Sequence, residues 1–425
     1  MSPLARITQA RLPRWLLPPA WPVNGREPAL ATLSLDDGKI TAVSPMVADA
    51  SAAAGATGVW DVQGAPVLPG LVDAHLHLDK TFTLSRMGKV PPGLLAAIDA
   101  MMVDRLDWTE ADVHARASRA LEAAYQAGCV HVRSHVDWWE PGSTPVAWKV
   151  LAGLTQEWRG RIEIEQVSLI KLTLFKELAQ ARTLAKQVAN TGPHAMLGAF
   201  VHTTNWDEDA LRHVFIAAHE AGLDVDLHVD EELNPQAQGV AATARIMREI
   251  GFTGRVVCGH ACALAMQPDS QALATLDALA TLSVTLVSLP ITNLLLQDAT
   301  SGRTPRLRGL TLVKEARARG IPVMLASDNV QDPFCRGGSY DPVEALAAGV
   351  FAAQLDQPFD TWSDSLCRRD WLRRGAAGTP DLQGAPANLV VFGAADACGW
   401  PSSASPRTVV RNGIPLLSSP QRLFS

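Results

Sequence analysis

Apolar runs and amphipathic segments alternate through the middle of the chain, from Val67 to about Leu382. The apolar runs have the length of buried strands, and the segments between them have the spacing of amphipathic helices. The runs that we interpret as strands end near His75, His135, Leu169, Val201, His228, His260, Leu289 and Asp328. Eight strand–helix units over roughly 300 residues predict a TIM-type (β/α)8 barrel.

Helix boundaries can also be predicted from local signals. Thr109 and Asp112 have the spacing of a capping box, with Asp in place of Glu. Pro235 suits the first turn of a helix after the fifth strand. Several helical segments stop at a glycine before the next strand, which is a common signal for a helix C-terminus. These glycines are Gly128, Gly160, Gly222, Gly251 and Gly320.

The two ends of the chain have a β pattern instead. Residues 32–43 read as two strands joined at Asp36-Asp37-Gly38, which predicts a hairpin. Near the other end, residues 388–392 and 408–410 have the β-rich composition of short strands, and Asn412-Gly413 predicts a turn. We therefore predict one small β domain built from residues 1–66 and 384–425, beside a barrel of residues 67–383.

Composition narrows the class of protein. The chain has 425 residues, of which 47% are hydrophobic, enough for one large and one small domain. A net charge of -6 without a basic block argues against a nucleic-acid partner. No apolar run is long enough for a membrane span, and the proline-broken residues 15–22 do not resemble a signal peptide. Six cysteines without a Cys-x-x-Cys pair favour free thiols and a cytoplasmic location.

Histidines and carboxylates gather where the predicted strands end. His75 and His77 are two residues apart, so an extended backbone places both on one face. His228 ends the fifth strand and Asp328 the eighth, and in a barrel these ends share one face. Three imidazoles and a carboxylate suit one divalent transition metal with a position left for water. The metal lowers the pKa of that water towards ~7, which provides hydroxide near neutral pH.

Two further residues are candidates for the proton transfers that hydrolysis of a C–N bond requires. Glu231 lies three residues beyond His228, and His260 ends the sixth strand, where it could orient the hydroxide or stabilise an intermediate. Each residue alone also has a structural explanation, such as a hydrogen-bonded strand-end histidine, an Asp-Asn turn or a solvated acidic loop. Their joint occurrence at the ends of strands favours a catalytic site.

The same residues carry a family resemblance. The chain resembles the amidohydrolase superfamily, and within it the cytosine deaminases and their close relatives, in residues 73–80, 131–137, 228–231, 289–297, 308–315 and 327–333. The resemblance implies a distorted barrel, a β-sandwich formed by both chain ends, and a homo-oligomer. It also implies one zinc or iron ion on His75, His77, His228 and Asp328. Glu231 would be the proton shuttle and His260 would lie beside the hydroxide, with Asp328 as the third catalytic residue.

Three positions bear on the substrate. Cytosine deaminases have a glutamine that binds the pyrimidine after the third strand, and Lys171 occupies the matching position. An ammonium only donates hydrogen bonds, so Lys171 would favour a ring oxygen or an anionic ring; the alternative is an exposed loop lysine without a role in binding. Asn329 replaces a second aspartate beside the metal ligand, and His202, after the fourth strand, is a candidate for the substrate pocket. In binuclear relatives, a carboxylated lysine at the end of the fourth strand bridges the two metals. Lys171 follows the third strand instead, so we favour a mononuclear site.

The leading hypothesis is a metal-dependent deaminase of an amino-substituted nitrogen heterocycle, such as a pyrimidine, with cytosine itself in doubt. The alternative is hydrolysis of an N-alkylamino-triazine, as in N-isopropylammelide hydrolases, or of a cyclic amide. A metal-binding protein without catalysis is disfavoured because no ligand or proton shuttle is missing. The sequence also lacks the His-x-Glu and Pro-Cys-x-x-Cys signature of cytidine-deaminase-type enzymes, and the glycine-rich motifs of nucleotide cofactors.

Overall fold

The computed structural model describes residues 3–46, 57–374, 381–393, 397–401 and 406–416. Its largest sheet has eight parallel strands that neighbour one another in chain order. They are β8 (Leu71–Leu76), β9 (Cys129–Asp137), β10 (Glu163–Lys171), β11 (Ala195–Val201), β12 (Val225–Val229), β13 (Val256–His260), β14 (Val284–Ser288) and β15 (Val323–Leu325). Each strand ends close to its predicted position, so the predicted barrel is confirmed.

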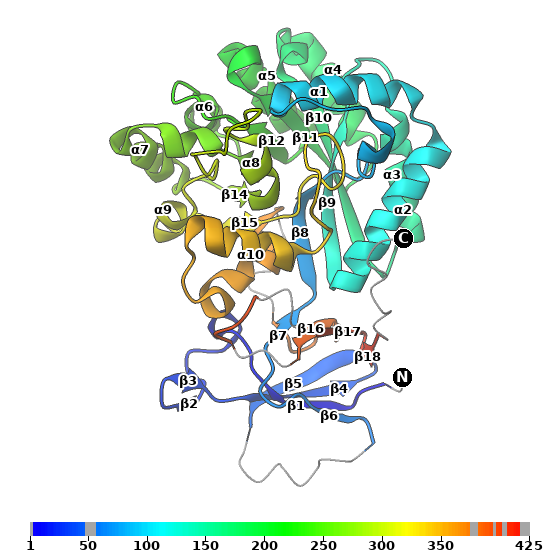
Figure 1. Cartoon of the computed structure of the whole chain (residues 1–425), viewed down its shortest axis with the longest axis vertical. Coiled ribbons are helices and arrows are strands. Elements are labelled where there is room, and N and C mark those ends of the chain that lie inside the picture. The colour runs from blue at the N-terminus through cyan, green and yellow to red at the C-terminus, as the bar shows by residue number, and fades with distance from the viewer. Residues whose placement is uncertain (1–2, 47–56, 375–380, 394–396, 402–405, 417–425) are drawn as a thin grey trace.

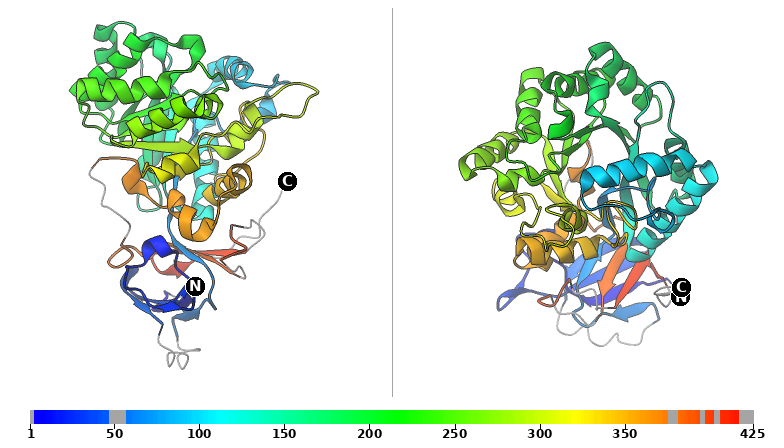
Figure 2. Two further views of the ribbon diagram at one scale, coloured as in Figure 1. Left: turned by 90° about the vertical axis from the view of Figure 1, so that its left-hand side faces the viewer. Right: turned by 45° about the horizontal axis from the view of Figure 1, so that its top comes forward.

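Helices cover the outside of this sheet (Figures 1 and 2). The connections between successive strands contain α1 (Leu94–Asp104), α2 (Glu110–Ala127), α3 (Val146–Glu157), α4 (Leu178–Ala189), α5 (Glu208–Ala221), α6 (Gly239–Ile250), α7 (Asp269–Leu279), α8 (Pro290–Leu296) and α9 (Val313–Ala318), and α10 (Pro342–Ala353) follows β15. Within the described ranges, no helix is long and apolar enough to cross a bilayer.

The predicted helix ends are largely confirmed. Thr109 caps α2 and accepts a hydrogen bond from the backbone N–H of Asp112. Gly128, Gly222 and Gly251 directly follow α2, α5 and α6 in the left-handed conformation. The prediction for Pro235 is wrong, because α6 begins only at Gly239. The backbone N–H groups of Gly239 and Val240 at that point are satisfied by the buried carboxylate of Asp230, so a side chain distant in sequence determines the start of the helix.

The barrel closes at a weak seam between its first and last strands. One bridge pairs Leu76 of β8 with Asp328, three residues beyond β15. The Asp328 N–H donates to the His75 carbonyl at 2.9 Å. Next to it, the Ser327 hydroxyl and N–H donate to the buried carboxylate of Asp73 at 2.5 and 3.1 Å. The seam therefore lies beside two residues that the sequence predicts as metal ligands.

A charged layer fills the barrel interior below that level. Arg133 of β9 is fully buried and donates to Glu165 of β10 at 2.7 and 2.9 Å and to Asp226 of β12 at 2.8 Å. Barrel interiors are usually filled with branched apolar side chains. Because Arg133 pairs with two carboxylates, the layer avoids the large cost of an unpaired buried charge.

Two four-stranded sheets lie below the barrel in Figure 1. One contains β1 (Arg6–Ala10), β4 (Ala31–Asp36), β5 (Lys39–Pro45) and β6 (Val59–Asp61), and the other contains β7 (Val67–Pro69), β16 (Leu389–Phe392), β17 (Arg407–Arg411) and β18 (Ile414–Pro415). A separate two-stranded sheet, β2 (Val23–Asn24) and β3 (Glu27–Pro28), lies between β1 and β4 in the chain. Apolar residues of both sheets, including Ile7, Leu33, Leu389 and Val410, share one buried cluster.

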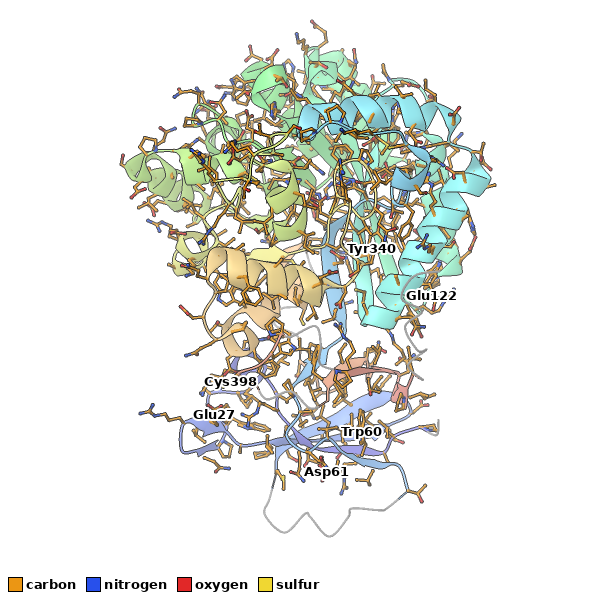
Figure 3. The ribbon with its side chains drawn as sticks, in the orientation of Figure 1. Glu27, Trp60, Asp61, Glu122, Tyr340 and Cys398 are labelled. Atoms are coloured by element: carbon orange, nitrogen blue, oxygen red, sulfur yellow. The ribbon has the colours of Figure 1, made fainter. Side chains whose placement is uncertain are left out.

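The predicted hairpin and turn at the two chain ends are both present. Asp36 pairs with Lys39 across Asp37 and Gly38, and Arg411 pairs with Ile414 across Asn412-Gly413. Figure 3 places Trp60 and Asp61 in this lower part and Tyr340 in the barrel part. Because β7 leads directly into the first residue of β8, these sheets lie at the amino-terminal end of the barrel strands. The division of the chain at residues 66 and 384 stays a prediction.

Replacing Gly198 in β11 with alanine should destabilise the barrel. A Cβ atom there would lie 2.6 Å from the Ser168 carbonyl oxygen and 2.8 Å from that of Asp226, both of them backbone atoms. We expect overpacking to lower the free energy of unfolding by ~1–3 kcal/mol. Gly153→Ala is the matched control, because Gly153 lies within α3 with open space around it and should gain ~1 kcal/mol. Equal melting temperatures of the two variants would contradict this account.

Candidate active site

Four side chains from both sides of the seam and from β12 meet at one point. Nε2 of His75 and Nε2 of His77 lie 3.1 and 3.3 Å from Nε2 of His228. Oδ1 of Asp328 lies 3.6 Å from Nε2 of His75 and 3.2 Å from Nε2 of His77. The structure thus brings together all four residues that the sequence predicts as metal ligands.

The chemistry of this cluster fits a divalent metal. Burial lowers the pKa of His75, His77 and His228 well below 6.5, so the three rings are neutral and their lone pairs are available. The carboxylate of Asp328 is buried, and its Oδ1 faces the imidazole nitrogens of His75 and His77. Three imidazole nitrogens and a carboxylate oxygen, all with lone pairs, therefore face one another, and a single shared proton can bridge only two of them. A metal cation bound between them would interact favourably with all four.

The surrounding backbone orients these ligands. Nδ1 of His77 lies 3.2 Å from the carbonyl oxygen of His135, and a proton on Nδ1 leaves Nε2 free to bind a metal. Asp328 and the nearby His260 both have left-handed backbone conformations, with φ of 63° and 66°. Such angles are uncommon for residues other than glycine and cluster at functional sites. The strain here is a consequence of aiming both side chains at the same point.

Glu231 and His260 form a pair beside the cluster. Oε1 of Glu231 lies 3.3 Å from Nδ1 of His260, and both side chains are buried. Burial, and to a lesser extent the Asp328 carboxylate, raise the pKa of Glu231 well above its usual value. Burial lowers the pKa of His260 to about 4. A carboxyl group whose pKa is shifted towards neutrality is suited to moving protons near pH 7.

Asn293 of α8 also contacts His260. Its side-chain amide lies 3.1 Å from Nδ1 of His260, the nitrogen that also faces Oε1 of Glu231. Nε2 of His260 is buried and has no hydrogen-bond partner among the described residues. His260 also belongs to a group with His75 and Asp328 whose possible ligand atoms lie within 4.8 Å of one another. A ring nitrogen of His260 thus lies at the cluster.

A cavity of about 220 Å³ opens onto these residues. Its apolar wall combines side chains of α1 with aromatic rings from β11 and from the segments after β9 and β15, and its polar lining includes His77 and His228 of the cluster. The lining includes Leu94, Leu95, Ile98, Trp139, Phe200 and Phe334, together with Lys80, Lys171, His77, His228, Glu231, His260 and Asn329. The cavity is smaller than the ~300–1,000 Å³ of typical ligand sites, so it suits a compact, flat molecule.

The three predicted substrate residues have different positions. Lys171 ends β10 and lines the cavity, with Nζ 4.3 Å from the centre of the Trp139 ring. Asn329 also lines it and donates to Asp332 at 2.6 Å. His202 is not among the lining residues, and its ring stacks on Phe200, with the ring centres 5.7 Å apart. Its role in substrate binding stays a prediction.

The sequence left open whether Lys80 contacts the substrate or pairs with an acid, and it did not single out several other residues of the cavity. Lys80, three residues beyond His77, is buried in the cavity wall, and its Nζ lies 2.6 Å from Oδ1 of Asp137. Both residues lie in stretches that the family resemblance highlighted, which is the signal that could have found them. The contributions of α1, Trp139 and Phe334 come from connections without a motif, so no pattern in the sequence indicated them.

Substituting His228 should abolish metal binding. We expect His228→Ala to reduce the metal content from about one ion per chain to near zero, because one of four converging ligands is lost. Elemental analysis of the purified proteins measures this. Glu231→Gln serves as the control, since Glu231 lies beside the cluster and not within it, and should keep its metal. Full metal content in His228→Ala would refute the assigned site.

Removal of the metal should also weaken the fold. His75, His77 and Asp328 lie on the two sides of the seam, so an ion that binds them stabilises the closed barrel by mass action. We expect a chelator to lower the melting temperature, and added zinc or iron to restore it. The His228→Ala variant should respond little to either treatment. An unchanged melting temperature after verified metal removal would show that the seam closes without the ion.

Comparisons with known proteins agree with this geometry. The model of the Amidohydrolase family matches residues 83–370. The chain is 36% identical over 340 residues to a pterin deaminase from Rhizobium rhizogenes, covering 79% of this chain and 76% of the relative. It is 28% identical to an N-isopropylammelide isopropyl amidohydrolase from a Pseudomonas species, over 49% of this chain and 53% of that one.

A solved structure extends the agreement to the whole fold. The structure of 5-methylcytosine deaminase from Klebsiella pneumoniae, liganded with 5-fluorocytosine, superposes with a TM-score of 0.80 and 24% identity over 97% of each chain. That structure covers the terminal sheets as well as the barrel. The confirmed barrel, the converging ligands and the family match lead to one conclusion: this chain belongs to the amidohydrolase family.

Proposed function

We propose that this protein is a metal-dependent hydrolytic deaminase that releases ammonia from an amino-substituted nitrogen heterocycle. The observation that carries the proposal is the buried Glu231 carboxyl group, which lies beside the metal cluster and lines the cavity. The similarity to a pterin deaminase supports the reaction type. The fold of 5-methylcytosine deaminase is compatible with it.

His75, His77, His228 and Asp328 would hold one zinc or iron ion, because imidazole and carboxylate donors suit both metals. Such an ion supplies a water molecule of lowered pKa and polarises the carbon–nitrogen bond. Glu231 accepts a proton from the attacking water and delivers it to the leaving nitrogen, since it lies beside the cluster and lines the cavity. His260 stabilises negative charge as it develops on oxygen.

We further propose a pterin-like substrate, a bicyclic nitrogen heterocycle with an exocyclic amine and a carbonyl oxygen on the ring. The similarity to a pterin deaminase suggests it, and the aromatic rings of Trp139, Phe200 and Phe334 form a lining suited to a flat ring. Lys80 and Asn329 lie on the polar side of the cavity and can hydrogen-bond ring atoms. The cavity volume argues against nucleosides and other substrates with bulky substituents.

Release of an alkylamine from a triazine is a second candidate. The similarity to N-isopropylammelide isopropyl amidohydrolase supports it. Leu94, Leu95 and Ile98 of α1 form an apolar wall that could accept a small alkyl group. The identity of the released amine separates the two candidates directly.

The compartment and the assembly are also proposals. All six cysteines are free, and five of them are buried, which is typical of a reducing compartment. We therefore propose a cytoplasmic protein. A homo-oligomer is proposed on the family resemblance alone, and size-exclusion chromatography with light scattering would test it.

The direct test is amine release from the protein loaded with zinc or iron. We expect ammonia from pterin, with smaller or no release from cytosine, and no isopropylamine from N-isopropylammelide. Glu231→Gln should bind metal but lower kcat by ~10²–10⁴-fold, the usual contribution of a general acid–base group. Glu232→Gln is the matched control, because Glu232 bonds Thr203 outside the cavity and should retain most activity. Normal turnover in Glu231→Gln would refute the mechanism.

A further inference from the structure

Lys171 lines the cavity and has no carboxylate partner among the described residues. Besides the metal-site histidines, the charged side chains that line the cavity are Lys80, Lys171 and Glu231. Lys80 is paired with Asp137 at 2.6 Å, and Oε1 of Glu231 lies 3.3 Å from Nδ1 of His260. In the part of the chain that the structure describes, Lys171 has no carboxylate partner and no hydrogen bond, and its ammonium contacts only the face of Trp139.

The position of Lys171 within the barrel separates it from the reacting centre. Residues 169 and 171 of β10 share one face of the strand, and both line the cavity. Lys171 pairs with Phe200 of β11, which pairs with His228 of β12. Two strand spacings therefore separate the Cα atoms of Lys171 and His228, roughly 10 Å. The Lys171 side chain reaches towards Trp139 beyond β9, further from β12.

We propose that Lys171 binds an acidic substituent on the heterocycle, at the end of the molecule opposite the carbon that loses its amine. This inference rests on the proposed deaminase function and names the substrate class, which is an amino-heterocycle that carries a carboxylate. Lys171 is half-buried in the cavity wall, so an anionic group that enters the cavity would gain a charge-assisted hydrogen bond from its ammonium group.

The size and donor count of the cavity favour a carboxylate over a phosphate. The space is about 220 Å³, much of which a bicyclic ring occupies. No arginine lines the cavity, whereas phosphate sites usually combine several donors. One ammonium group matches a single negative charge. A compact acid on the ring edge therefore fits both the charge and the volume better than a phosphoryl group does.

The test compares matched substrates that differ only in an acidic group. Ammonia release is measured for pterin against its 6- and 7-carboxylates, and for cytosine against its 5-carboxylate, with the metal-loaded protein. We expect kcat/KM to be higher for at least one acid than for its neutral partner. In Lys171→Gln, kcat/KM for that acid should fall about 10- to 100-fold, the range for a charge-assisted hydrogen bond. The neutral partner should change by less than about 3-fold.

Lys176→Gln is the matched control, because Lys176 lies five residues further on, is exposed and does not line the cavity. It should leave both members of each pair unchanged. An equal loss for acid and neutral substrates in Lys171→Gln would show that Lys171 only positions the ring, and would overturn the inference. Higher kcat/KM for every neutral substrate in the wild type would overturn it as well.

A binding measurement separates this inference from the proposed function. Calorimetric titration of metal-loaded Glu231→Gln with the same pairs needs no turnover. If no substrate releases ammonia from the wild type, the proposed function fails. The inference about Lys171 then stands only if an acid binds this variant more tightly than its neutral partner, and if adding Lys171→Gln removes the difference. Equal binding of both members overturns it.

Discussion

The closure of the barrel between β8 and β15 is the constraint on which the rest of the site depends. One backbone bridge and the contacts of Ser327 with Asp73 join the two strands. Three of the four converging ligands lie on this seam. The same few residues therefore complete the barrel and define the metal position, so the geometry of the site is fixed by the step that closes the sheet.

The charged layer inside the barrel supports this arrangement from below. His135 stacks on His75 with ring centres 3.8 Å apart, and its Nε2 lies 3.7 Å from Asp226, which Arg133 also binds. Glu165 connects Arg133 to His131 at 3.1 Å. Because each of these charges is buried, removing one partner leaves the other uncompensated, which usually costs several kcal/mol. The layer thus supports the ring of His75, because His135 stacks on it and lies against Asp226, which pairs with Arg133.

Much of the fold and the metal cluster could be predicted from the sequence, because strands, their ends and the His-x-His spacing are local patterns. Period-two alternation places His75 and His77 on one face whatever surrounds them. The charged layer follows the same alternation at residues 131, 133 and 135, but which carboxylates pair with Arg133 depends on neighbouring strands. The place of α1 in the cavity wall and the start of α6 could not be predicted, since packing determines the first and the carboxylate of Asp230 the second.

Helix α1 contributes to the substrate cavity but not to the groups proposed for catalysis, so different segments of the chain carry the two roles. It lies in the connection between β8 and β9, and it begins after Gly93, whose φ of 102° allows a sharp change of direction. Its side chains form one wall of the cavity, while the groups proposed for proton transfer and metal binding come from strand ends and the segments that directly follow them. Sequence changes in this helix can therefore alter which molecules fit without disturbing the reaction chemistry. Exchanging this one segment between related barrels offers a route to new substrate ranges.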